Sequence, residues 1–189
     1  MTMFFLIRHA ACDGLGQTLW GRTPGVCLNE EGKLQARELA EAIAGTTFDA
    51  IYSSPLERAY ETADAIACRM KLEVMQSEAL NEIEYGEWSA KSFAELSADE
   101  RWRHFNEHRS IASVPGGESF LEVQNRVVKE IDRLSEKHGD ARIALVTHAD
   151  VIRAAISYFD DTQIELLLRG DVPPCGIHRL HRFAKAKPA

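Results

Sequence analysis

The amino-acid sequence predicts an α/β protein, a three-layer αβα sandwich with a mainly parallel central sheet and helices on both faces. Two observations predict it. Short apolar segments of strand character alternate with helical patterns along the 189 residues, which is the order that βαβ units produce. Residues 3–8 and 142–147 are also nearly continuously apolar, as strands buried on both faces are.

A single domain over residues 1–189 is expected, because the chain has no internal repeat or interdomain linker and its length suffices for one substantial core. Hydrophobic residues make up 45% and charged residues 27%, which is typical of a globular protein. The first residues hold no basic leader and no apolar run of membrane-spanning length, so we expect a cytoplasmic protein. The formal charge of -7 argues against nucleic-acid or anionic-membrane partners.

The first half of the chain should begin with a strand over residues 3–8 and a loop to about residue 28. Asn29 can cap the next helix, whose apolar residues share one face: Ala36, Leu39, Ala40 and Ile43. A second strand covers residues 48–53. The following Ser54-Pro55-Leu56-Glu57 predicts a helix to about Met70 with Ser54 as its N-cap, proline first and glutamate three residues after the cap.

The second half alternates in the same way. The patterns predict a strand over 71–76, a loop over 81–89, helices over 92–107 and 118–137, a strand over 142–147, a helix from about 149, a helical stretch over 162–169, and a last strand over 177–183. Val114-Pro115-Gly116-Gly117 separates the two central helices. The basic run over 178–187 is interpreted as this strand followed by a solvated tail.

Arginines and histidines follow three of these strands. Ligands of such sheets bind beyond the carboxyl ends of the strands, where Arg8, His9, Arg58 and His148 are all expected. Arginine offers a fork of donors suited to phosphate oxygens, and the start of a helix also favours an anion. Neighbouring arginines should lower the pKa of His9 and keep its imidazole neutral and nucleophilic.

The same residues have plainer interpretations when taken one at a time. His148 could be a hydrogen-bonded structural histidine, and Arg58 a surface residue of an amphipathic helix. Their shared position at strand ends favours a site for a dianion. The cysteines add no site, since Cys12, Cys27, Cys68 and Cys175 form no C-x-x-C pair and none has arginine six residues later.

Six segments, in order, resemble those of the histidine phosphatase superfamily, the phosphoglycerate mutase-like enzymes. Residues 5–10 resemble its R-H-G signature. The others are 28–36 (L-t-x-x-G-x-x-Q-A), 53–59 (S-S-P-L-x-R-A), 80–88 (L-x-E-i-x-x-G-x-W), 115–119 (P-G-G-E-S) and 146–153, around the second histidine. The resemblance covers nearly the whole chain.

This resemblance implies that His9 is the nucleophile, that Arg8, Arg58 and His148 bind the phosphoryl oxygens, and that Glu82 donates the proton. It also implies no metal and no other cofactor. Without it, Glu82 would be one of several candidate acids in this region, together with Glu78, Glu84 and Glu87.

The sequence departs from the family pattern beside both histidines. Ala10-Ala11-Cys12 replaces the usual G-E-T or G-Q-T, and Ala149-Asp150 replaces paired glycines. Asp150 could favour a helix N-terminus, or, if it points at the phosphate, repel a dianion. Arg22, in Gly21-Arg22-Thr23-Pro24-Gly25, could contact the substrate or lie in a surface loop.

We therefore expect a phosphomonoesterase that acts on a small phosphorylated metabolite through a phosphohistidine. A phosphoglycerate mutase-type phosphotransferase is an alternative, but family mutases carry extra segments where this chain has only residues 89–114. A noncatalytic phospho-ligand binding module is a second. A metal-dependent phosphoesterase is a third; its candidate ligands match no compact metal motif: His9, Asp13, Asp49, His148 and Asp150.

Overall fold

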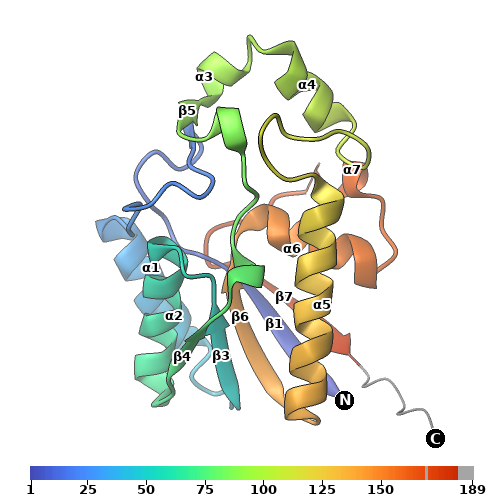
Figure 1. Ribbon diagram of the computed structural model, residues 1–189. Coiled ribbons are helices and arrows are strands. Elements are labelled where there is room, and N and C mark those ends of the chain that lie inside the picture. Colours follow the sequence, from blue (N-terminus) through green and yellow to red (C-terminus); the bar gives the residue numbers. More distant parts are fainter. Residues whose placement is uncertain (169, 183–189) are drawn as a thin grey trace, which may run out of the picture.

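The computed structural model describes residues 1–168 and 170–182, and it confirms the predicted fold class (Figure 1). Its main sheet has the strand order β4-β3-β6-β1-β7. The strands are β1 (Thr2–Arg8), β3 (Ala50–Ser53), β4 (Val74–Gln76), β6 (Arg142–Thr147) and β7 (Ile177–Arg182). All neighbours are parallel except β7, which pairs antiparallel with β1. In the described part of the chain no helix combines the length and apolar character needed to span a membrane.

Helices cover both faces of this sheet because successive strand residues point to opposite sides. Phe5 and Ile7 of β1 belong to one core cluster with residues of α1 (Glu30–Ala42) and α2 (Glu57–Met70). Phe4 and Leu6 belong to the other, with residues of α5 (Phe120–His138) and α6 (Ala149–Phe159). The near-continuous apolar sequence of β1 thus reflects burial on both faces.

A smaller layer stands over the carboxyl ends of the strands, at the top of Figure 1. It contains η2 (Gly86–Trp88), β5 (Lys91–Ser92), α3 (Phe93–Leu96) and α4 (Glu100–Glu107), whereas η1 (Glu78–Leu80) lies below it, against α5 and β6. β5 pairs antiparallel with β2 (Thr18–Leu19), a small sheet that the sequence did not predict. The helix predicted over 92–107 is divided in two, because Asp99 caps α4 by accepting from the Arg101 amide.

The start of α2 differs from the prediction. The helix begins at Glu57, its N-cap is Leu56, and no side chain caps it, so the assignment of Ser54 as N-cap was wrong. The Ser54 hydroxyl instead donates to Asn81 Oδ1 at 2.9 Å and lies 3.0 Å from His148 Nε2. Tertiary hydrogen bonds thus outweigh the local capping preference.

The remaining boundaries agree within a few residues. The Asn29 cap is confirmed, since its side chain accepts from the Gly32 amide. β3 and β4 are shorter than predicted, and Lys71, which ends α2 in the left-handed conformation with φ of 57°, delays the start of β4. The helical stretch near 162–169 is α7 (Ile164–Leu167). Residue 169, the predicted end of the last strand at Phe183, and the basic tail beyond it lie outside the described residues.

Candidate active site

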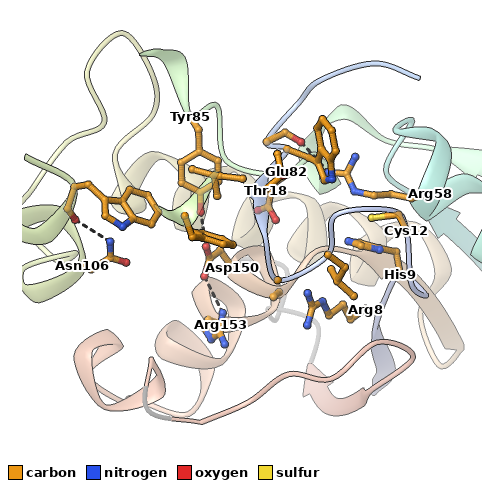
Figure 2. Close-up of a pocket in the computed structure, with 18 of the residues that line it drawn as sticks. Arg8, His9, Cys12, Thr18, Arg58, Glu82, Tyr85, Asn106, Asp150 and Arg153 are labelled. Atoms are coloured by element: carbon orange, nitrogen blue, oxygen red, sulfur yellow. Dashed lines mark hydrogen bonds and ion pairs between the residues drawn. The ribbon is translucent and has the colours of Figure 1, made fainter. Parts of the chain in front are cut away.

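A cavity of about 270 Å³ lies at the carboxyl ends of the strands, under the smaller layer (Figure 2). Arg8 and His9 enter its lining from the end of β1, Arg58 from the first turn of α2, and Glu82 from the loop after η1. The volume is below the usual range of about 300–1,000 Å³ for sites of drug-sized ligands. The cavity is therefore suited to a small molecule.

His9 is fixed as a neutral imidazole in the cavity wall. Its side chain is buried, and its Nδ1 lies 2.7 Å from the Ala10 carbonyl oxygen. Because a carbonyl oxygen only accepts, Nδ1 carries the proton and Nε2 keeps a free lone pair. Burial and the charges of Arg58 and Arg8 lower the pKa of His9 to about 3. At neutral pH, Nε2 is thus an available nucleophile.

Arg8 and Arg58 supply the positive charge beside His9. Arg58 Nη2 donates to the Gly21 carbonyl oxygen at 2.8 Å, and Arg8 Nη1 donates to the Val172 carbonyl oxygen. Arg58 Nη1 and Arg8 Nε are buried and have no hydrogen-bond partner among the described residues. Buried cationic donors without partners are costly, and an anion in this cavity would offset that cost.

His148 lies behind the cavity surface, with its ring centroid 5.1 Å from that of His9. The Ser54 hydroxyl donates to Asn81 Oδ1, so the His148 Nε2–H must donate to Ser54 Oγ, at 3.0 Å. This leaves Nδ1 of the neutral ring as an acceptor, 3.4 Å from Arg58 Nη2. Burial, Arg58 and His9 hold the pKa of His148 well below its usual range.

Glu82 is placed to hold a proton at neutral pH. Its Oε1 accepts from the Ile83 amide at 2.9 Å. Burial and the nearby charge of Asp150 raise its pKa to about 7. Among the acids that the sequence offered as candidates, only Glu82 lines the cavity. Glu78 accepts from Asn81, Glu84 pairs with Arg22, and Glu87 pairs with Arg101 outside it.

The family model of the histidine phosphatase superfamily (branch 1) matches residues 4–187. This chain belongs to that superfamily. It is 34% identical over 162 residues to phosphoserine phosphatase 1 of Hydrogenobacter thermophilus, which covers 82% of this chain and 74% of the relative. It is 36% identical over 160 residues to phosphoglycerate mutase-like protein 4 of Arabidopsis thaliana, covering 79% and 67%.

A solved structure agrees with the family assignment. The phosphoserine phosphatase of Entamoeba histolytica, in complex with phosphoserine, superimposes on this chain with a TM-score of 0.85 and 29% sequence identity. The match covers 95% of this chain and 90% of that one. The chain is therefore a histidine phosphatase in fold as well as in sequence, and phosphatases are among its relatives.

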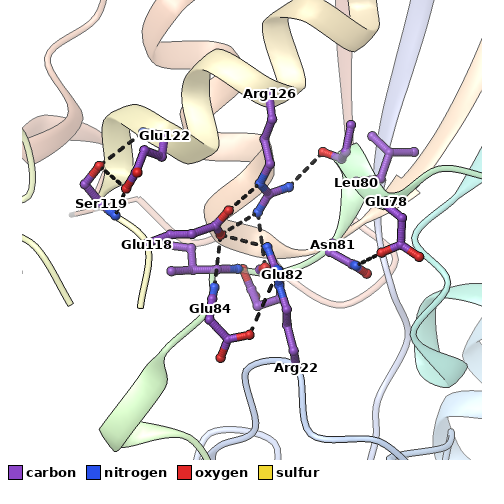
Figure 3. Close-up of polar contacts among 12 residues, drawn as sticks. Arg22, Glu78, Leu80, Asn81, Glu82, Glu84, Glu118, Ser119, Glu122 and Arg126 are labelled. Atoms are coloured by element: carbon purple, nitrogen blue, oxygen red, sulfur yellow. Dashed lines mark hydrogen bonds and ion pairs between the residues drawn. The ribbon is translucent and has the colours of Figure 1, made fainter. Parts of the chain in front are cut away.

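In this histidine phosphatase, Arg22 lies next to the acid and outside the cavity lining (Figure 3). Its Nε donates to the Glu82 carbonyl oxygen at 2.8 Å, and its Nη2 to Glu118 Oε2 at 2.8 Å. Arg126 donates to the same carbonyl oxygen at 3.1 Å and to Glu118. These contacts hold the backbone of the acid loop. A substrate contact from Arg22 stays a prediction.

Asp150 satisfies both sequence-based interpretations in part, since it lies in the first turn of α6 and also lines the cavity. Its charge is compensated: Oδ1 pairs with Arg109 at 2.8 Å and Arg153 at 3.0 Å, and Oδ2 accepts from the Tyr85 hydroxyl at 2.5 Å. Sequence reasoning missed these three partners. Only Arg153, three residues along the same helix, had a local signal.

The ligand set of the metal-dependent alternative is not brought together. Asp49 accepts from the Arg142 amide at the start of β6, at the opposite end of the sheet from His9 and His148. Among residues 1–168 and 170–182, no group of three or more histidine, cysteine, aspartate or glutamate side chains could hold a metal ion. The described residues therefore do not form the ligand cluster which that alternative expected.

Proposed function

We propose that this histidine phosphatase hydrolyses a small phosphorylated metabolite through a phosphohistidine at His9. The observation that carries the proposal is the buried, neutral imidazole, whose Nε2 is free beside two arginines in a small cavity. Glu82, in the same lining, can hold the proton that the leaving group needs. A noncatalytic binding module would have no use for this paired nucleophile and acid.

In the first step, Nε2 of His9 attacks phosphorus in line with the ester oxygen, and the bond to that oxygen breaks. Glu82 gives its proton to the departing oxygen, which leaves as the alcohol. Arg8 and Arg58 stabilise the charge on the three remaining oxygens. The product is a phosphohistidine and an ionised Glu82.

In the second step, the Glu82 carboxylate takes a proton from water, whose oxygen attacks phosphorus and displaces Nε2. Phosphate leaves, and both His9 and protonated Glu82 are regenerated. His148 orients Arg58 through its Nδ1 in the resting enzyme. A bound dianion would favour a proton on that nitrogen, which would then donate to a phosphoryl oxygen.

Hydrolysis is favoured over a mutase reaction. A mutase must return the phosphoryl group to a substrate, and the segment that roofs the cavity, residues 89–114, is short in this chain. Phe93 and Trp102 of this segment line the cavity and restrict its volume. A small leaving alcohol that departs and is replaced by water fits this space.

The charge of the lining suggests which small metabolites to test. The cavity is lined by four arginines: Arg8, Arg58, Arg109 and Arg153. When Glu82 is protonated, Asp150 is the one negatively charged side chain in the described lining. A phosphoryl dianion leaves about one positive charge uncompensated. We infer an acidic leaving group, such as one with a carboxylate. Phosphoserine and 3-phosphoglyceric acid, each bound in a structure of the Entamoeba histolytica enzyme, are of this kind.

A cytoplasmic location and the lack of nucleic-acid and membrane partners stay predictions from composition.

A rapid-quench experiment with ³²P-labelled 3-phosphoglycerate tests the mechanism. The protein should acquire a label that is stable in base and lost in acid, as phosphohistidine is. His104→Ala, a change on α4 outside the cavity lining, should label normally, whereas His9→Ala should not. Normal labelling of His9→Ala would refute the assignment.

Glycerol 3-phosphate tests the substrate class, since it has a hydroxymethyl group where 3-phosphoglycerate has its carboxylate. We expect kcat/KM to be about tenfold or more higher for 3-phosphoglycerate, as for loss of one charged contact. Equal values would remove the inferred preference for an acidic leaving group and leave the phosphatase mechanism untouched.

A further inference from the structure

Two carboxyl groups line the cavity, and the mechanism so far uses only one of them. We propose that Asp150 is a positioning residue for the acid–base step: its buried carboxylate, paired with two arginines in the same cavity, keeps the proton on Glu82 in the resting enzyme. The proposal rests on the role given to Glu82 in the proposed function. It assigns a purpose to a residue that stands where the family pattern has glycine.

Asp150 is held rigidly as an anion. The residue is 7% exposed: Oδ1 forms ion pairs with Arg109 and Arg153, and Oδ2 accepts from the Tyr85 hydroxyl. Burial opposes ionisation of this carboxyl, but the two arginines and the Tyr85 hydrogen bond outweigh burial and hold its pKa below its usual range. These contacts favour the ionised form of Asp150.

Glu82 lacks such compensation at its own carboxyl. One oxygen accepts from the Ile83 amide, and no arginine among residues 1–168 and 170–182 makes an ion pair with either oxygen. Burial first, and then the negative charge of Asp150, favour the protonated form. The side chain is only partly covered, because it faces the cavity into which it would deliver its proton.

Many cations face Glu82 from the surrounding elements, and they act against protonation. They are Arg8 after β1, Arg58 on α2, Arg109 after α4, Arg126 on α5 and Arg153 on α6, with Arg22 at the Glu82 backbone. Of the remaining charged or titratable groups, Tyr85 is buried and neutral, and Glu118 is paired with Arg22 and Arg126. Asp150 is the one other carboxylate in the described lining. Its charge offsets the arginines that would otherwise ionise the acid.

Asp150→Asn tests the proposal directly, because asparagine keeps the shape and removes the charge. The titration of Glu82 can be followed by ¹³C NMR of glutamate-labelled protein, with its carboxyl signal assigned by its loss in Glu82→Gln. We expect the midpoint of the titration to fall by about one pH unit or more. Asp160→Asn, the same change in charge just after α6, should leave the midpoint within a few tenths of a unit.

A second variant gives a shift of opposite sign. Arg153→Gln removes a partner of Asp150 that is 16% exposed in its side chain, so the anion is less compensated and the midpoint of Glu82 should rise. An unchanged midpoint in folded Asp150→Asn would overturn the proposal. If that variant fails to fold, an unchanged or lowered midpoint in Arg153→Gln would overturn it instead.

Enzyme kinetics supply a readout that a merely structural role would not move. With an alkyl phosphate, the basic limb of the kcat/KM profile should shift to lower pH in Asp150→Asn by the same amount as the NMR midpoint. The NMR titration needs no turnover. Failure to trap a phosphohistidine would thus refute the proposed function, whereas unmoved midpoints would refute only the role of Asp150.

Discussion

Replacing Glu82 by glutamine should slow the hydrolysis of alkyl phosphates by ~10² to ~10⁴-fold, the usual contribution of general acid catalysis. This corresponds to about 3–5 kcal/mol of activation free energy. Glutamine keeps the size of the side chain, and its amide oxygen can still accept from the Ile83 amide, as Oε1 does at 2.9 Å. The change therefore removes the proton and little else.

The pH at which this loss is largest follows from the pKa of Glu82, which is about 7. At pH 6 about nine-tenths of the native enzyme carries the proton, and at pH 8 about one-tenth does. The advantage of the native enzyme over Glu82→Gln in the first step should therefore shrink as the pH rises through 7. Its kcat/KM for an alkyl phosphate should fall in the same interval, whereas that of the variant should not.

p-Nitrophenyl phosphate separates the two steps, because nitrophenolate leaves without a proton. Glu82→Gln should release one equivalent of nitrophenol in a fast burst and then turn over slowly, since the base for the attacking water is missing. Glu84→Gln is the matched control: Glu84 is two residues away and does not line the cavity. An equal loss in both phases for both kinds of substrate, or a burst in the control as well, would move the acid role away from Glu82.

Further variants test the anion site and the packing that supports it. Arg58→Ala and His148→Ala should each lower kcat by ~10² to ~10³-fold while the circular dichroism spectrum is unchanged, because both residues act on oxyanion charge. Arg69→Ala, on the exposed end of the same helix as Arg58, should retain full activity. Near-native turnover in either Arg58→Ala or His148→Ala would remove that residue from the site. Gly32→Ala should lower the free energy of unfolding in urea by at least ~1–3 kcal/mol, since an added Cβ would lie 1.9 Å from the Ala11 carbonyl oxygen, whereas Gly45→Ala, with open space around it, should be nearly neutral.

The gathering of the anion site could be predicted because it follows from sheet topology. Arg8 pairs with Thr147 across parallel strands β1 and β6, so the residues that follow, His9 and His148, emerge side by side. Ser53 pairs with Val146 in the same way and brings the start of α2 to this edge. These relations need only the strand assignments and the rule that ligands bind at the carboxyl ends.

The supporting contacts could not be predicted, because they join segments that no local pattern connects. Ser54 has the sequence signature of an N-cap, yet its hydroxyl is used by Asn81 and His148. Nothing in the local sequence links Arg126 to the acid loop, yet it donates to the Glu82 carbonyl oxygen. In both cases the side chain forms a hydrogen bond with a polar group of the site, although water or its own helix end could have been its partner.

Asp150 shows how such contacts change the meaning of a single residue. Alone beside the phosphate it would repel the substrate, and as a helix N-terminal residue it would be a minor stabiliser. With Arg109 paired to it at 2.8 Å, its charge is compensated, so neither description is sufficient alone. A glycine at this position would leave the buried Arg109 cation without its counterion, which is costly. The departure from the family pattern at Asp150 therefore requires Arg109, which comes from the 89–114 segment that also lines the cavity. If Asp150 keeps the proton on Glu82 as proposed, this ion pair links the 89–114 segment to the acid.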